Sequence, residues 1–235
     1  MRPTLAVFDF DGTLTSFDSS LPFIVFARGS ARVARSLMIR APFFAADLAV
    51  AAVREAKTDQ RVSVRGRWGQ AVHERLIRSN FRGMGRADFR ELGRRFAAEA
   101  LDPMIAPGAL EQVAWHRSRG HECVLVTGSI DCYTEPWGHR VGFRKVVATR
   151  IAFDSQGRVA GTFDGGPCWG HAKPVRLREV AGPLEDYNLV VYGNEPDDHA
   201  LLSVANHPVP VRAGESWAEI GARAKAALGA AERSR

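Results

Sequence analysis

Two aspartates with one residue between them stand at the end of the first apolar run of the chain. The run Thr4 to Phe10 leads into Asp9-Phe-Asp11-Gly12, where apolar residues give way to carboxylates and then to a glycine. Paired carboxylates at this spacing can work as a nucleophile and as a general acid and base. Gly12 lets the backbone turn sharply away from them. The simpler alternative is an acidic turn at the end of a strand.

Three later segments also carry residues suited to chemistry, each next to an apolar run or a helical pattern. Thr127-Gly128 follows the run 122–126, and Gly193-Asn194 follows the run 189–192. Lys173 stands at the start of an expected helix. Taken singly these signals are weak, because strand-Thr-Gly turns are common and a lysine at a helix start is usually solvated.

In their order along the chain, these four segments resemble the four motifs of the haloacid dehalogenase superfamily of phosphatases. The resemblance implies that Asp9 attacks phosphorus to form an aspartyl phosphate, while Asp11 protonates the leaving oxygen and later takes a proton from water. It also implies that the Thr127 hydroxyl and the backbone N–H groups after it hold the phosphoryl group, with Lys173 as a fixed cation. Gly12 and Gly128 are the predicted substrate-binding glycines.

The fourth segment, Gly193-Asn-Glu-Pro-Asp-Asp198, resembles the acidic motif that helps to bind Mg²⁺ in this superfamily. The resemblance predicts a Mg²⁺ cofactor held by Asp9, Asn194, Asp198 and the main-chain carbonyl of Asp11. The superfamily commonly has an aspartate at the position of Asn194. Because an amide oxygen coordinates without adding charge, we expect the metal to bind less tightly here.

The elements that must position these residues are apolar runs that alternate with helical patterns. Helices are expected at 108–119, 171–180, 198–205 and 216–228, and a fourth short strand at 209–212. The alternation predicts an α/β fold with a Rossmann-like parallel sheet and helices on both faces. In such a sheet, ligands bind beyond the carboxyl ends of the strands.

Residues 19–103 interrupt this alternation and predict a helical cap domain, inserted into a core domain formed by 1–18 and 104–235. The segment is rich in Arg and Ala, and turn residues near 29–30, 40–42, 57–59 and 83–85 divide it into roughly four helices. A second, smaller interruption comes before Lys173. There, two apolar runs, 151–153 and 159–163, flank Asp154-Ser-Gln-Gly157, which is a β-hairpin signal.

The place of the predicted cap resembles the superfamily branch that includes phosphoserine phosphatases. The hairpin and Cys168-Trp-Gly resemble bacterial members of that branch, including phosphatidylglycerophosphate phosphatases. The resemblance implies that the cap closes over the substrate and selects it. Asp18 stands where phosphoserine phosphatases carry an acidic substrate contact, and it is equally suited to cap a helix N-terminus.

Composition indicates a globular protein with one strongly basic segment. The 235 residues are 46% hydrophobic with a net charge of +6, and residues 20–100 contain 16 Lys or Arg against 7 Asp or Glu. Such a segment fits phosphates or an anionic membrane surface as well as it fits solvated helix faces. Arg28, Arg32 and Arg35 form one candidate membrane stripe, and packing within the cap's own small core is the slightly favoured alternative. No RNA-binding signature accompanies the charge, so no nucleic-acid partner is expected.

Cysteine usage and the apolar segments favour a cytoplasmic protein, at most peripheral to the inner membrane face. Asp9 and Asp11 fall where a signal peptide needs apolar residues, and the most apolar later stretch, 41–53, is shorter than the roughly 20 residues of a membrane span. Three cysteines without CxxC spacing suggest neither disulfides nor zinc. We expect Cys168 to be a packed thiol, and His73, His116 and His121, which lack metal-binding spacing, to be packing or surface residues.

These observations favour a Mg²⁺-dependent phosphomonoester hydrolase for a small phosphorylated metabolite, such as a phosphoserine-like ester, or for a phospholipid head group. One alternative is a phosphotransferase, in which an alcohol accepts the phosphoryl group from the same intermediate. Another alternative, motivated by Asn194, is a protein that binds a phosphorylated ligand without turning it over. The sequence predicts neither the substrate nor the oligomeric state.

Overall fold

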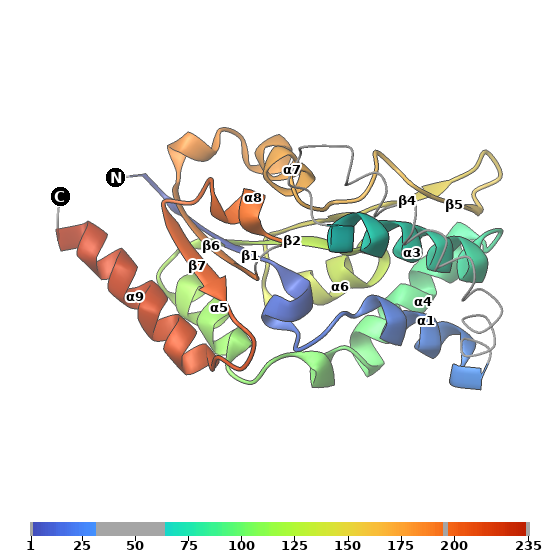
Figure 1. Cartoon of the computed structure of the whole chain (residues 1–235), viewed down its shortest axis with the longest axis horizontal. Coiled ribbons are helices and arrows are strands. Elements are labelled where there is room, and N and C mark those ends of the chain that lie inside the picture. Colours follow the sequence, from blue (N-terminus) through green and yellow to red (C-terminus); the bar gives the residue numbers. More distant parts are fainter. Residues whose placement is uncertain (1, 32–63, 195–196, 234–235) are drawn as a thin grey trace.

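A five-stranded parallel sheet forms the centre of the molecule, which confirms the predicted α/β fold. The computed structural model describes residues 2–31, 64–194 and 197–233 (Figure 1). The strand order is β3-β2-β1-β6-β7, and every neighbouring pair runs parallel. The strands are β1 (Thr4–Phe8), β2 (Glu122–Ile130), β3 (Lys145–Thr149), β6 (Asn188–Asn194) and β7 (His207–Val211).

Helices cover both faces of this sheet because its central strands are apolar on both sides. In β1, Ala6 and Phe8 pack into one buried cluster, whereas Leu5 and Val7 pack into another on the opposite face. The first cluster includes residues of α5 (Ala109–Ser118), α6 (Asp131–Val141) and α9 (Trp217–Arg233), and the second includes residues of α7 (Ala172–Ala181) and α8 (His199–Leu202). Short 3₁₀ helices span Asp102–Met104 and Leu184–Asp186.

Between β1 and β2 the chain forms a helical insert, of which α1 (Ser20–Arg28), α3 (Val64–Phe81) and α4 (Arg86–Glu99) are described. Its core is aromatic: the Phe23 ring lies 5.3 Å from the rings of Phe81 and Phe96 and 4.9 Å from that of Tyr133 on α6. The predicted breaks near 29–30 and 83–85 coincide with helix ends. Those near 40–42 and 57–59, and the apolar stretch 41–53, lie outside the described residues.

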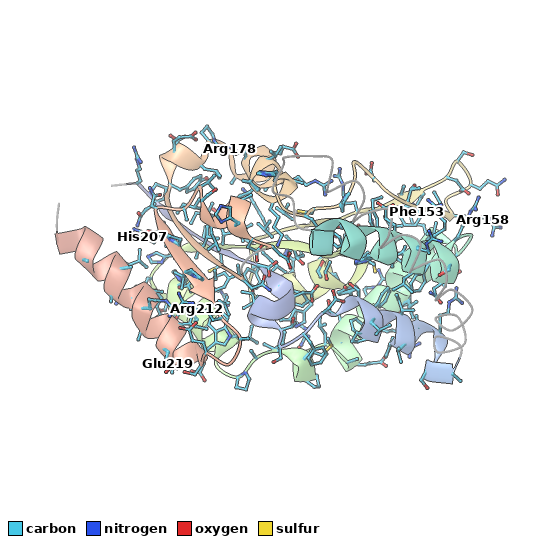
Figure 2. All side chains as sticks on the ribbon, viewed as in Figure 1. Phe153, Arg158, Arg178, His207, Arg212 and Glu219 are labelled. Carbon is cyan, nitrogen blue, oxygen red and sulfur yellow. The ribbon has the colours of Figure 1, made fainter. Side chains whose placement is uncertain are left out.

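The predicted hairpin is present as β4 (Ile151–Phe153) and β5 (Val159–Phe163), which pair antiparallel. It is hydrogen-bonded to the loop between α3 and α4, since Gly83 N donates to Val159 O and Val159 N donates to Met84 O, both at 2.9 Å. The guanidinium of Arg86 lies 4.4 Å from the centre of the Phe153 ring, at the end of the molecule that also carries Arg158 (Figure 2). The hairpin is therefore attached to the helical insert.

Two elements were not predicted from the sequence, and several element boundaries differ from the predicted ones. Strand β3 was not predicted, because a single residue separates it from β4. The two strands therefore resemble one continuous segment that interrupts the alternation of strands and helices. Helix α6 was not predicted either, because Pro136 and Gly138 within it are poor helix formers. Strand β2 continues through Thr127-Gly128 to Ile130, beyond the predicted end at Val126. Among the described helices, none is both long and apolar enough to cross a membrane.

Candidate active site

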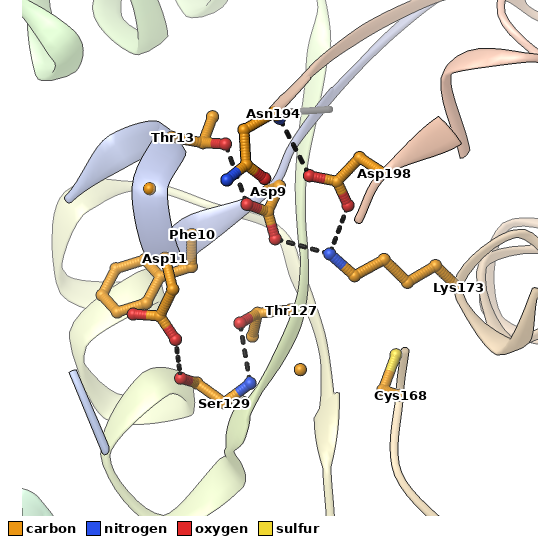
Figure 3. Close-up of polar contacts among 12 residues, drawn as sticks. Asp9, Phe10, Asp11, Thr13, Thr127, Ser129, Cys168, Lys173, Asn194 and Asp198 are labelled. Atoms are coloured by element: carbon orange, nitrogen blue, oxygen red, sulfur yellow. Dashed lines mark hydrogen bonds and ion pairs between the residues drawn. The ribbon is translucent and has the colours of Figure 1, made fainter. Parts of the chain in front are cut away.

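Asp9 lies at the carboxyl end of the central strand and is almost completely buried, with 3% of its surface exposed. Its main-chain N–H donates to Tyr192 O of β6 at 2.9 Å, so the sheet fixes its backbone. One carboxylate oxygen accepts a hydrogen bond from the Thr13 hydroxyl at 2.8 Å, and the other accepts one from Lys173 Nζ at 2.6 Å (Figure 3). The carboxylate is thus held in one orientation by partners on both oxygens.

Lys173 joins Asp9 to Asp198. Its ammonium donates to both carboxylates, and the second oxygen of Asp198 accepts the N–H of Asn194 at 3.0 Å. Burial opposes the charge of Lys173, but the two carboxylates outweigh it and raise its pKa, so the side chain is a cation. Burial and the charge of Asp9 raise the pKa of Asp198 to about 7. One buried ammonium therefore serves two buried carboxyl groups, an arrangement that favours a further cation.

Asp11 has different partners. One carboxylate oxygen accepts the main-chain N–H of Ser19 at 2.9 Å, and the other accepts the hydroxyl of Ser129. The Ser19 hydroxyl lies 3.1 Å from that of Ser129 and 3.0 Å from that of Tyr133, which extends the network to α6. Burial first, and then the charge of Asp18, raise the pKa of Asp11 to about 7 against the effect of these hydrogen bonds. A carboxyl with that pKa can hold or release a proton near neutral pH.

Gly12 allows the backbone to turn between these two aspartates and the rest of the site. The backbone forms a tight helical turn over Phe10–Leu14, in which Gly12 has a φ of 74°. A Cβ on this residue would lie 2.6 Å from Asn194 Nδ2. The glycine thus permits both a left-handed conformation and the close approach of Asn194.

Thr127 and Gly128 lie in the carboxyl-terminal half of β2. Thr127 is completely buried, and its hydroxyl oxygen accepts the N–H of Ser129 at 2.9 Å. A Cβ on Gly128 would overlap the indole of Trp169, so this aromatic ring lies directly against the glycine. The carboxyl ends of β1, β2 and β6 thus bring Asp9, Thr127 and Asn194 together, and α7 adds Lys173 (Figure 3).

The oxygen donors at this edge fit the predicted magnesium ion. Within residues 2–31, 64–194 and 197–233, no three His, Cys, Asp or Glu side chains form a metal-binding group. The donor set consists instead of the carboxylates of Asp9 and Asp198, the amide of Asn194, whose side chain points toward Asp9 (Figure 3), and the main-chain carbonyl predicted at Asp11. These are hard oxygen donors with uncompensated negative charge, as Mg²⁺ prefers. Glu195 and Pro196 of the predicted motif lie outside the described residues.

Two predicted residues stand apart from the nucleophile. Asp18 accepts the N–H of Ser20 at 2.8 Å, a local turn contact one residue before Ser19, the N-cap of α1, and its charge acts on Asp11. Of the arginine stripe, only Arg28 is described: it donates to the Asn80 carbonyl, and its guanidinium lies 5.6 Å from the centre of the Phe81 ring. This arginine packs within the insert, whereas Arg32 and Arg35 lie outside the described residues.

Cys168, predicted to be a packed thiol, is buried, and burial raises its pKa.

Ser129, Ser19 and Thr13 contact the two aspartates although sequence reasoning gave them no role. Ser129 had a readable signal, because in a strand it shares a face with Thr127 two residues earlier. Thr13 follows the aspartate pair after Gly12, but the sequence indicated no separate role for it. Ser19 had no local signal, since its contact with Asp11 depends on where the insert begins.

A cleft of 760 Å³ opens beside the site. It is lined by the turn residues Gly12 and Thr13, by Asn194, and by the segment Pro210–Trp217 that follows β7. The site therefore has an opening on the β6–β7 side of Asp9.

Comparison with known proteins agrees with this geometry. The profile of the haloacid dehalogenase-like hydrolase family matches residues 6–203, which include every predicted motif. Protein CicA of Caulobacter vibrioides is 29% identical over 206 residues, spanning 87% of this chain and 84% of that protein. A histidinol-phosphatase of Neisseria meningitidis is 28% identical over 126 residues, which cover 52% of this chain and 57% of the relative. The crystal structure of a phosphoserine phosphatase in its apo form shares the fold, with a TM-score of 0.55, 17% identity, and coverage of 87% and 84%.

Proposed function

Because the chain belongs to the haloacid dehalogenase-like hydrolase family, we propose that it hydrolyses phosphomonoesters through an aspartyl phosphate on Asp9. The observation that carries this proposal is the contrast between its two aspartates. An ammonium and a hydroxyl orient the carboxylate of Asp9, whereas Asp11 is held by a serine hydroxyl and has a pKa raised to about 7. Two carboxyl groups in such different environments suit a nucleophile and a proton donor.

The proposed reaction has two steps. In the first, a carboxylate oxygen of Asp9 forms a bond to phosphorus, the ester P–O bond breaks, and the Asp11 proton moves to the leaving alcohol oxygen. In the second, Asp11 removes a proton from water, the water oxygen attacks phosphorus, and the acyl phosphate bond breaks to release phosphate and restore Asp9. Lys173 and the Thr127 hydroxyl stabilise the phosphoryl group in both steps.

Asp9, Asn194, Asp198 and the Asp11 carbonyl would hold Mg²⁺. The ion would supply positive charge against the phosphate and the nucleophile. Lys173 alone leaves an excess of negative charge at this edge, and this supports the cofactor proposal.

The proposed substrate is a small phosphorylated metabolite or a phospholipid head group. The similarity to a histidinol-phosphatase and the fold shared with a phosphoserine phosphatase support a phosphate ester of a small alcohol. The basic charge of residues 20–100 is the support for an anionic membrane as a second partner of a cytoplasmic protein. Sedimentation with neutral and anionic vesicles tests that partner, since binding through this charge requires anionic lipid and weakens with salt.

A phosphate-release screen with Mg²⁺ across amino-acid, sugar, nucleotide and lipid phosphates tests the proposed function. The blank is Asp9→Asn, whose neutral amide is a poor nucleophile and which should lose several orders of magnitude of activity. More than a few per cent of residual activity, in protein shown by mass spectrometry not to have deamidated, would exclude the aspartyl-phosphate mechanism. Transfer to an added alcohol would identify a phosphotransferase, and binding without release would identify a phospho-ligand binding protein.

A further inference from the structure

A buried histidine of the helical insert has a ring nitrogen that the proposed chemistry does not use. His73, on α3, is 7% exposed, and its Nε2 has no hydrogen-bond partner among the described residues. A buried polar atom without a partner costs free energy, so it is usually paired with water, an ion or a ligand. Burial lowers the pKa of His73, although the charge of Asp18 acts in the opposite direction, and the ring is accordingly neutral at pH 7.

Two successive contacts connect this ring to the candidate active site. The His73 ring packs edge-on against Trp169, with 5.6 Å between ring centres, and the Trp169 indole lies directly against Gly128. Gly128 stands between Thr127 and Ser129, and the Ser129 hydroxyl binds Asp11. The ring of Phe163, on the hairpin, lies 5.8 Å from His73 on another side. The rings of Trp169 and His73 thus form a continuous aromatic surface. It extends from Gly128, beside the proposed phosphoryl-binding residues, to α3 of the insert.

We propose that His73 and Trp169 form the subsite for the alcohol part of the substrate. The apolar portion of the alcohol lies against the Trp169 indole, and a hydroxyl or amine further along it hydrogen-bonds to His73 Nε2. This inference rests on the proposed function, and it specifies the class of ester: a small alcohol with a second polar group, rather than a simple alkyl phosphate.

A neutral imidazole suits this role better than a charged side chain would. It can accept a hydrogen bond at one nitrogen and donate one at the other, and its apolar ring edges can remain buried against Trp169 and Phe163. A site that buries such a nitrogen binds a ligand without the matching polar group poorly, because the nitrogen then stays unpaired. The expected signature is therefore discrimination between esters of equal size.

The test measures equilibrium binding to the Asp9→Asn protein with Mg²⁺ present. The probes are inorganic phosphate and three matched series of phosphate esters, namely ω-amino, ω-hydroxy and unsubstituted alkyl phosphates with equal numbers of heavy atoms. At one chain length we expect a polar ester to bind about tenfold more tightly than the alkyl ester, the effect of one buried hydrogen bond. Adding His73→Phe should reduce this preference to less than about twofold, and His73→Gln should restore part of it, because its amide can replace Nε2.

Two further measurements separate recognition from a structural role. Inorganic phosphate should bind equally well to all three proteins, because it does not reach the subsite. The Tm of His73→Phe should equal or exceed that of the protein with His73, since the substitution removes an unpartnered buried nitrogen. Equal weakening of phosphate binding, or a preference for polar esters that survives His73→Phe or is never observed, overturns the proposal.

The outcome is also distinct from that of the proposed function. If wild-type protein releases phosphate from esters but His73→Phe does not alter the preference, hydrolysis stands and the subsite is wrong. If wild-type protein releases no phosphate while His73→Phe abolishes a binding preference, the subsite stands and hydrolysis is wrong.

Discussion

Asp9 and Asp11 are two residues apart in the chain, yet they meet different neighbours because the backbone passes from an extended conformation at Asp9 into the tight turn that begins at Phe10. Asp9 faces Lys173 and the end of β6, whereas Asp11 faces Ser19 and Ser129. The Ser129 hydroxyl beside Asp11 can donate to a carboxylate or accept from a protonated carboxyl, whereas the partner of Asp9 is the Lys173 ammonium. The division of labour between the aspartates therefore comes from their neighbours.

Replacing Asp11 by Asn should slow the hydrolysis of an ester most when its leaving group needs a proton. We expect a 10²- to 10⁴-fold loss of kcat/KM for alkyl phosphates, the typical contribution of general acid–base catalysis, and a clearly smaller loss for p-nitrophenyl phosphate. Steady-state kinetics with both substrates checks this prediction. Ser118→Ala, on the exposed end of α5, provides a folding and assay control. Equal losses for both substrates would argue against Asp11 as the proton donor.

Replacing Asn194 by Asp should strengthen metal binding. Without metal, the new carboxylate should destabilise the protein by repelling the neighbouring carboxylates. The new carboxylate would stand beside Asp9 and Asp198, so the half-saturating Mg²⁺ concentration should fall about tenfold, while the Tm without metal should fall. Metal titrations of activity and thermal unfolding with and without Mg²⁺ measure the two effects. Asn188→Asp, at the other end of β6, adds the same charge away from the site. An unchanged Mg²⁺ requirement would show that Asn194 is not a ligand.

At the level of elements, the insert reaches the sheet through a close contact between helices α4 and α6. Gly93 on α4 is buried, and a Cβ there would overlap the main-chain carbonyl of Cys132 on α6. A main-chain atom cannot rotate away as the end of a side chain can. The spacing between the two helices is therefore set by this glycine.

The Gly93→Ala variant tests that contact through the sign of its effect. In an exposed helix, replacing Gly by Ala stabilises by up to about 1 kcal/mol, but here we expect a loss of about 1–3 kcal/mol of unfolding free energy from overpacking. Urea denaturation gives the value, and Ala98→Ser, at an exposed position of the same helix, should change it by less than about 0.5 kcal/mol. A stabilised Gly93→Ala protein would show that α4 and α6 can separate without cost.

Some of the strands and helices were predictable from the sequence and others were not. The strands that carry Asp9, Thr127 and Asn194 were predictable because they are apolar runs ending in polar residues, and the hairpin was predictable from its flanking runs and Gly157. Strand β3 and helix α6 were not, since one lacks a separating turn and the other contains Pro136. The contacts of Ser19 and His73 depend on long-range packing of the insert, which no local pattern encodes.

For the molecule as a whole, a buried histidine network links α5 to the sheet. His116 Nε2 lies 2.8 Å from the Tyr192 hydroxyl of β6, and its Nδ1 lies 2.8 Å from Nδ1 of His121. Burial first, and then the neighbouring charges of His121 and Lys225, lower the pKa of His116 to about 3. The folded protein thus favours the neutral ring far more strongly than the unfolded chain does.

This pKa difference predicts acid sensitivity of the fold. Because the folded pKa is depressed below the unfolded value of 6.5, the contribution of neutral His116 is complete above pH 6.5 and is lost as pH falls toward 3. Within this window, the unfolding free energy should fall by up to about 1.4 kcal/mol per pH unit from this group. Urea denaturation between pH 7 and 4 should show a shallower decline for His116→Gln than for wild type. Parallel declines would assign the acid sensitivity to other groups.

The attachment of the hairpin to the insert also bears on how the two halves of the molecule can move. The chain passes between sheet and insert at Leu14–Ser16 and Met104–Ala106, and these two passages are themselves hydrogen-bonded, with Ala106 N donating to Leu14 O at 2.8 Å. If these two passages were the only connection, the insert could rotate about them as about a hinge. Backbone hydrogen bonds from β5 to the α3–α4 loop also join the hairpin to the insert, so any rotation of the insert relative to the sheet must move the hairpin with it and bend the segments on either side of β4 and β5.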